Sequence, residues 1–220
     1  RRFGDAERPE EWPRPAGEWV AALLAHDCDR DALAAALRDR VSHIIELSDD
    51  GGAGETWLGV PADDQSIYLS LTTTTAMSAQ PAMLICDALT ERGVLPLDRR
   101  APVELCLHEA VANGVTHGNL GVDSSAKDQP EGYRVFSQLI NERLRDPQCR
   151  ARRIDVYVRW RDGEVLMSVA DEGNGFDVGE LRLQPDGAAR SGRGFLFMRA
   201  LADGLTIGDG GRCTTLRFEV

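Results

Sequence analysis

The order of helical and strand-like patterns along this chain predicts an α+β fold, a two-layer sandwich in which a mostly antiparallel sheet carries helices on one face. Helical patterns are grouped early in the sequence and strand patterns late. The late strands are joined by hairpin turns, whereas a doubly wound parallel sheet needs regular strand–helix alternation, which is absent after Ile154.

The first 64 residues are expected to form an N-terminal extension. Residues 1–17 are rich in proline and charge, as is typical of a linker, and residues 55–60 form a short strand-like run. Between them lies a helical pattern capped by Asp29 or Asp31. Its apolar positions are Leu33, Leu37, Val41, Ile44 and Ile45. Residues 65–220 are assigned to the main domain.

Capping residues and apolar spacing predict the first elements of that domain. In chain order these are a strand over residues 66–71, a helix over 80–92 capped by Ser78 and ended by Gly93, and a helix over 99–117 capped by Asp98.

A polar stretch and a further amphipathic helix make residues 119–153 an insertion. The helix ends at Asp146-Pro147, and its apolar side chains are Tyr133, Phe136, Ile140 and Leu144. We expect this apolar face to bind a partner protein or a second copy of the chain.

The last third of the chain predicts a strand pair followed by a lid. Residues 154–160 and 164–170 alternate between apolar and polar, and Arg161-Asp162-Gly163 is a hairpin turn. Residues 177–191 are polar and rich in glycine and alanine, which is typical of a mobile lid. A helix over 195–201 follows, with closing strands at Thr206 and 214–220.

Composition and charge exclude several classes of protein. No run approaches the roughly 18 apolar residues of a membrane span, and the first residues lack the apolar core of a secretion signal. The five cysteines have no metal-ligand spacing, so we expect neither zinc nor disulfides in a cytoplasmic protein. The net charge of −11 argues against a nucleic-acid partner. Lys127 is the one lysine, so charged contacts to phosphate must use arginine almost everywhere.

A carboxylate and an amide share one face of the helix predicted over 99–117. Four residues advance about 400°, so Glu109 and Asn113 project within about 40° of each other. Asn113 and Gly114 are poor helix formers, and their place in mid-helix costs about 1 kcal/mol in helix propensity. This cost argues against the alternative that Glu109 and Asn113 are merely solvated helix residues. An amide oxygen beside a carboxylate suits Mg²⁺, and Glu109 can then act as general base at a terminal phosphate. The opposite, apolar stripe is expected to pack on a sheet and consists of Val103, Leu107, Ala110, Val111, Gly114 and Val115.

Asp171 ends a predicted strand and is followed by Gly173 and Gly175. Taken alone, this pattern is more often a plain turn, because glycine permits positive φ. Beside the helix of Glu109 and Asn113 it gains a second interpretation, in which Asp171 accepts the exocyclic amine of adenine and the glycines let the purine lie against the backbone.

A glycine-rich segment precedes the last predicted helix. Gly192 and Gly194 leave backbone N–H groups free at the positive end of the helix dipole, which is a common way to hold phosphate. Arg190 and Arg193 are close enough in sequence to add charge, although a glycine hinge with solvated arginines is an equal alternative. His117, two turns after Glu109, is a further candidate for nucleotide contact, or a structural hydrogen-bonding residue.

In order and spacing these motifs resemble the ATPase superfamily of gyrase, heat-shock chaperones, histidine kinases and MutL (GHKL). Residues 105–118 resemble its N box, 170–176 its first glycine box, and 190–198 its second. Thr214-Thr215 is similar to the closing strand whose first threonine helps to hold adenine. Within the superfamily, residues 65–220 look most like the bacterial anti-sigma-factor serine/threonine kinases.

The resemblance implies a Bergerat-type ATP-binding fold with ATP and Mg²⁺ as cofactors. It implies Asn113 on magnesium, Glu109 as catalytic base, Asp171 and Thr214 on adenine, and the second glycine box on the phosphates. It also implies phosphorylation of a serine on an anti-anti-sigma (antagonist) protein and binding of a sigma factor. The sequence departs from the family in its extension, its insertion, and Cys213 in place of the usual glycine.

Two other functions stay open at this point. One is a nucleotide-sensing module that binds a signalling partner without kinase turnover, supported by the apolar face around Phe136. The other is the output domain of a longer two-component-type signalling protein, with residues 1–64 following an upstream receiver or sensor.

Overall fold

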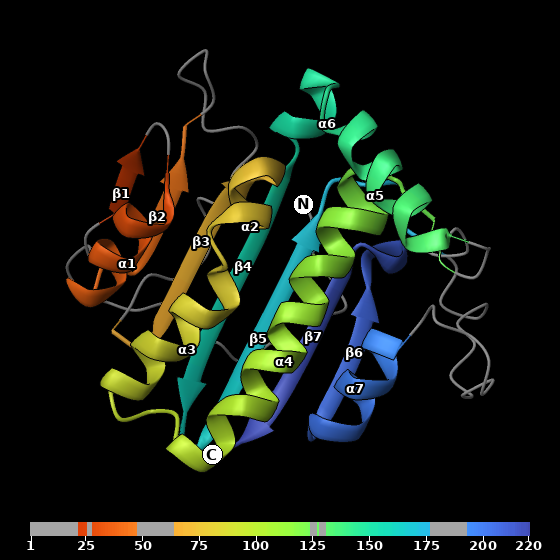
Figure 1. Cartoon of the computed structure of the whole chain (residues 1–220). Helices are drawn as coiled ribbons and strands as arrows, with labels where there is room; N and C mark the ends of the chain where they lie inside the picture. The colour runs from red at the N-terminus through yellow and green to blue at the C-terminus, as the bar shows by residue number, and fades with distance from the viewer. Residues whose placement is uncertain (1–21, 26–27, 48–63, 124–126, 128–130, 177–192) are drawn as a thin grey trace.

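A computed structural model describes residues 22–25, 28–47, 64–123, 127, 131–176 and 193–220 (Figure 1). Its strands form one sheet in the order β1-β2-β3-β4-β5-β7-β6. They are β1 (Ala22–Ala25), β2 (His43–Glu46), β3 (Ser66–Thr72), β4 (Arg153–Arg161), β5 (Glu164–Asp171), β6 (Gly204–Gly208) and β7 (Cys213–Glu219).

The sheet is mixed but mostly antiparallel. Strands β1, β2 and β3 pair in parallel, and every other neighbouring pair is antiparallel. Helices α2, α3, α4 and α7 lie over one face of the sheet, and α5 and α6 lie at one end of it (Figure 1). The predicted α+β sandwich is therefore confirmed.

Most of the helices lie between β3 and β4 in the chain, and most of the strands follow them. The helices are α1 (Arg30–Arg38), α2 (Thr73–Ser78), α3 (Pro81–Glu91), α4 (Leu97–Asn113), the π-helix η1 (Gly114–Asn119), α5 (Gly132–Arg143), α6 (Pro147–Ala151), α7 (Arg193–Leu201) and the 3₁₀ turn η4 (Asp209–Gly211). None of the helices in the described part of the chain is long and apolar enough to cross a membrane.

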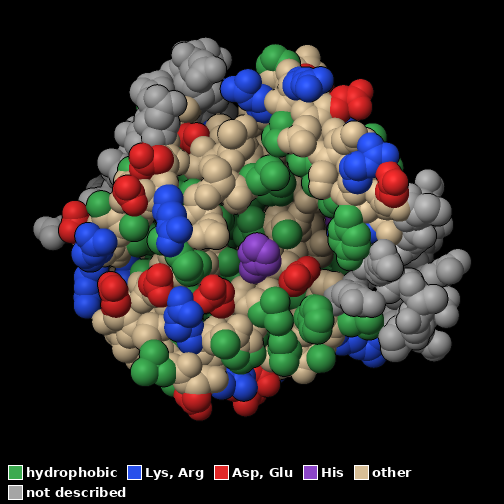
Figure 2. All heavy atoms as spheres, in the orientation of Figure 1, with side chains coloured by type: hydrophobic (Ala, Val, Ile, Leu, Met, Phe, Trp, Pro, Cys, Tyr) green, Lys and Arg blue, Asp and Glu red, His purple; other side chains and the backbone are tan. Residues whose placement is uncertain are grey.

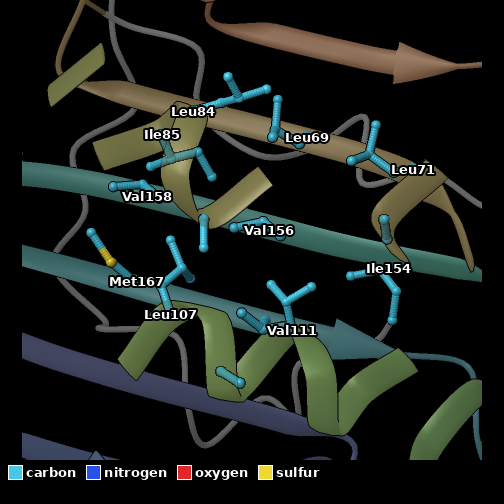
Figure 3. Close-up of a cluster of buried hydrophobic side chains, with 14 of the residues drawn as sticks. Leu69, Leu71, Leu84, Ile85, Leu107, Val111, Ile154, Val156, Val158 and Met167 are labelled. Carbon is cyan, nitrogen blue, oxygen red and sulfur yellow. The ribbon is translucent and has the colours of Figure 1, made fainter. Parts of the chain in front are cut away.

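The main hydrophobic core lies between α3, α4 and the middle strands (Figure 3). Alternate residues of β3, β4 and β5 point toward the helices, as a period of two requires. The side chains labelled there are Leu69, Leu71, Leu84, Ile85, Leu107, Val111, Ile154, Val156, Val158 and Met167, and all of them are buried.

The helix predicted from Leu33 to Ile45 is shorter than expected. Helix α1 ends at Arg38, Arg40 has a left-handed φ of 59°, and Ile44 and Ile45 belong to strand β2. The prediction was wrong there because β-branched residues gain more by pairing between β1 and β3 than by extending the helix. Of the two proposed caps, Asp29 is the one used, since its side chain accepts from Ala32 N. The predicted linker over 1–17 and strand over 55–60 lie outside the described residues.

Two predicted caps were wrong, although the helices they were assigned to exist. Ser78 is the last residue of α2, and its hydroxyl donates back to Thr74 O. Helix α3 instead begins after Gln80, whose φ of 55° turns the chain. Asp98 lies in the first turn of α4 rather than at its cap, which is Pro96. An acidic side chain in the first turn still stabilises the helix, because it lies near the positive end of the helix dipole.

The hairpin between β4 and β5 is confirmed. Arg161 pairs with Glu164, and the two residues between them, Asp162 and Gly163, both have positive φ, 54° and 80°. Two such residues are the signature of a type I′ turn, whose twist matches that of the strands.

The apolar face of α5 is not available to a partner as expected. Phe136 is 9% exposed, and Ile140 and Leu144 pack against the chain's own core. Tyr133 at the start of the helix is 58% exposed. Helix α5 is therefore packed on its own chain, where Phe136 lies beside His117 of η1 and Arg143 Nε donates to Leu120 O over 2.7 Å.

Candidate functional site

Helix α4 presents two contrasting faces, as its sequence predicts. The apolar stripe opposite Glu109 and Asn113 is buried against the sheet, whereas these two residues are half-buried. The helix-bearing face of the molecule is hollowed near its middle, between α2 and α4 (Figure 2). The buried stripe contains Val103, Leu107, Ala110, Val111, Gly114 and Val115.

Glu109 lies against the N-terminal turn of α7. A β-carbon added to Gly194 would overlap Glu109 Oε2 and lie 3.5 Å from its Cβ. The first motif therefore touches the last one, although 84 residues separate them. The charge of Glu109 also reaches the neighbouring thiol, since burial first and this carboxylate second raise the pKa of Cys106 to about 11.

Asn113 carries a buried polar atom without a hydrogen-bond partner in the described part of the chain. Its Nδ2 is inaccessible to solvent and unpaired there. A buried amide left unpaired costs about 1–3 kcal/mol, so such groups call for an explanation. Because an amide's N and O are interchangeable by a flip, the same side chain fits either a phosphate oxygen or a cation.

Asp171 ends β5 directly against the π-helix. A β-carbon on Gly118 would overlap the Asp171 carboxylate, and one on Gly114 would lie 3.5 Å from Asp171 Cβ. Gly173 N donates to Asp171 Oδ1 over 2.8 Å, which fixes the carboxylate from the other side. The second motif therefore touches the C-terminal end of the first.

The glycines of the second motif are required by close backbone packing. A β-carbon on Gly173 would overlap the backbone of Gly118, and one on Gly175, where φ is 70°, would overlap Gly210 O. Phe176 N donates to Gly210 O over 2.9 Å, which ties this loop to the turn before β7. Their predicted contact with a purine stays a prediction.

Thr214 lies close to Asp171 through strand pairing. It is opposite Val169 on β5, two residues before Asp171, and Asp171 N donates to Arg212 O over 3.0 Å. Since alternate residues share a face, Thr214 and Asp171 project toward the helices from neighbouring strands. Thr214 is buried.

Part of the predicted phosphate site lies outside the described residues. This holds for Arg190, Gly192 and the lid expected over 177–191. Helix α7 begins at Arg193, two residues before the start predicted at Phe195. The position of Gly194 in the first turn agrees with the expectation that the helix N-terminus faces the site.

His117 points toward α5. Its Nδ1 donates to Val122 O, and its ring centroid lies 6.5 Å from that of Phe136. Although much of the side chain is exposed, partial desolvation of the ring lowers its pKa below the ordinary value, and the charge of Lys127 adds to this effect. These contacts give the residue a structural hydrogen bond, while its predicted contact with nucleotide stays a prediction.

Sequence reasoning missed Asn119 and Glu172, which tie the site together. Asn119 is fully buried at the end of η1, and its side chain accepts from Glu172 N over 2.7 Å. The one available signal was a polar side chain directly after His117-Gly118, and nothing local reveals which residues it would meet.

Comparison with known proteins gives a family match over the later part of the chain. Residues 141–218 match the family model of the histidine kinase-like ATPase domain. The match runs from the end of α5 into β7 and includes Asp171, both glycine-rich motifs and Thr214. Helix α4 lies outside the matched residues, and its continuation η1 and Glu109 contact the matched segment at Asp171 and Gly194. A search of curated proteins gave no match.

A histidine kinase-like ATPase domain uses ATP, generally with Mg²⁺, which accords with the donors present. Among the described residues, no group of three or more His, Cys, Asp and Glu side chains gathers as a metal site. Magnesium held by Asn113 together with phosphate oxygens and water stays a prediction. This is the way the ion is usually bound beside nucleotides.

Proposed function

We propose that the chain is an ATP-dependent regulatory protein kinase of the anti-sigma-factor type, acting on a serine or threonine of an antagonist protein. The observation that carries the proposal is the convergence of two distant motifs on the helix that carries the first. Glu109 meets Gly194 at one end, Asp171 meets Gly118 at the other, and Asn113 lies between. The two contacts are roughly 13 Å apart along the helix axis, the length of an extended ligand rather than of a lone ion.

In this proposal each residue has a task. Asp171 and Thr214 would hold the adenine end, the N-terminus of α7 would hold the phosphates, and Asn113 would hold magnesium, which would supply charge that offsets that of the phosphates. Glu109 removes the proton from the substrate hydroxyl as its oxygen attacks the terminal phosphorus. The bond to the bridging oxygen breaks, and ADP leaves with the electron pair.

The regulatory part of the proposal follows from the resemblance of the motifs. In this role the nucleotide-bound protein binds a sigma factor and releases it when the antagonist protein binds. The kinase then phosphorylates the antagonist protein. The net charge of −11 favours protein partners over nucleic acid.

Calorimetry with ATP and ADP, with and without magnesium, tests the binding step. We expect binding by the wild type, a loss of at least about tenfold in affinity for Asp171→Asn, and no change for Glu104→Gln. Glu104 is a matched control on α4, where it pairs with Arg100 outside the site. A wild-type chain that binds neither nucleotide would overturn the proposal.

Labelled ATP and the cognate antagonist protein test the chemistry. Transfer by the wild type and its loss in Glu109→Gln, with nucleotide affinity retained, is the expected result. If ATP changes partner affinity but no phosphate is transferred, the chain is a nucleotide-sensing module rather than a kinase.

A further inference from the structure

The side chain of Asn119 makes three hydrogen bonds at the junction of four elements. Its Nδ2 donates to Thr73 Oγ1 on α2 and to Arg153 O on β4, both over 2.9 Å. Its Oδ1 accepts from Glu172 N, which follows β5. The residue has no exposed surface, so these bonds are not exchanged for water.

Three of these groups form a closed ring. Asn119 donates to Arg153 O, Arg153 N donates to Glu172 Oε2 over 2.6 Å, and Glu172 N donates back to Asn119 Oδ1. Each residue is therefore held at two points. The ring fixes the backbone at Glu172, the residue between Asp171 and Gly173.

The same ring holds Asp171 from two directions. Gly118, which precedes Asn119, packs against the Asp171 carboxylate, and Gly173 N, which follows Glu172, donates to it. The widened turn of η1 makes this possible. Leu120 N bonds to Val115 O, five residues back, so Gly118 faces the strand end while Asn119 points inward.

We propose that Asn119 is a positioning residue that holds Asp171 where it accepts the amine of adenine, and that it thereby sets the preference for adenine over guanine nucleotides. The inference rests on the proposed function. Adenine presents a donor amine where guanine presents a carbonyl oxygen, so a fixed carboxylate attracts the first and repels the second. A carboxylate free to shift can instead accept from other N–H groups of guanine.

The test compares ADP and GDP affinities in matched variants by calorimetry. Asn119→Leu removes the ring, whereas Thr73→Val removes a hydrogen bond to the same Asn119 amide from outside the ring. Both should lower the midpoint of urea unfolding. We expect only Asn119→Leu to reduce the ratio of GDP to ADP dissociation constants, by about tenfold, the worth of one well-placed hydrogen bond.

A second pair of variants keeps the test decisive if Asn119→Leu fails to fold. Glu172→Ala opens the ring at a half-buried side chain, and Glu172→Gln keeps an oxygen for Arg153 N. The ratio should fall in the first and be restored in the second. Equal ratios in all variants, with a selective wild type, would overturn the role of Asn119 alone, whereas a wild type that binds neither nucleotide would overturn the proposed function with it.

Discussion

The Asp171 carboxylate lies so close to Gly118 that no β-carbon fits between them. This contact joins the end of a strand to the π-helix that continues α4, and it brings the second motif to the first. Gly118 does not have a positive φ, so the need for glycine there is one of space rather than of backbone conformation.

Gly118→Ala should therefore weaken the site. The added methyl must displace Asp171, which costs about 1–3 kcal/mol as overpacking and moves the carboxylate away from adenine. We expect a lower urea midpoint together with weaker ADP binding in calorimetry. Gly93→Ala is the control, because its φ of 73° strains alanine while no atom lies within 4 Å of the new carbon. Loss of stability in both variants with unchanged ADP affinity in Gly118→Ala would contradict the prediction.

Gly194→Ala should slow phosphate transfer without lowering the stability of the protein. The new methyl meets the flexible end of Glu109, which can move aside, and alanine favours the helix by about 0.5–1 kcal/mol. We expect an unchanged or slightly raised urea midpoint but slower phosphate transfer, measured with labelled ATP. Transfer at the wild-type rate would show that the position of Glu109 does not matter to the reaction.

Asn113→Ala should raise the stability of the protein and remove the magnesium dependence of ATP binding. The variant removes a buried Nδ2 that has no partner in the described chain and replaces a poor helix former, so stability should rise by about 1 kcal/mol. The magnesium dependence of ATP binding should disappear. Calorimetry with and without magnesium measures the second effect, and a fall in stability with magnesium dependence intact would refute both parts.

The stability of the protein should fall in mild acid through His117. Its pKa in the folded state lies below the ordinary 6.5, so the unfolded chain binds the proton more readily. Its contribution to stability is complete above pH 6.5 and decreases as the pH falls through 6.5 toward the lower, folded-state pKa. Urea unfolding at pH 8 and pH 5.5 should show a smaller loss for His117→Gln than for the wild type. Identical losses would exclude the residue as a cause.

Local chemistry in the sequence was sufficient for much of the fold. Asp162-Gly163 specifies its hairpin because two positive φ values are cheap there, and the alternation on either side fixes which face of each strand is buried. The helical spacing from Val103 to Val115 likewise determined the face of α4 that packs on the sheet, and with it the placement of Glu109 and Asn113 on the other face.

Tertiary structure decided what depends on partners distant in sequence. Ile44 and Ile45 fit a helix or a strand equally well until β1 and β3 offer them backbone hydrogen bonds. In the sequence Phe136 indicates a partner surface, and only the fold buries it beside His117. Asn119 is an ordinary polar residue in the sequence, and it acquires three hydrogen bonds only because Thr73, Arg153 and Glu172 are brought to it by the fold.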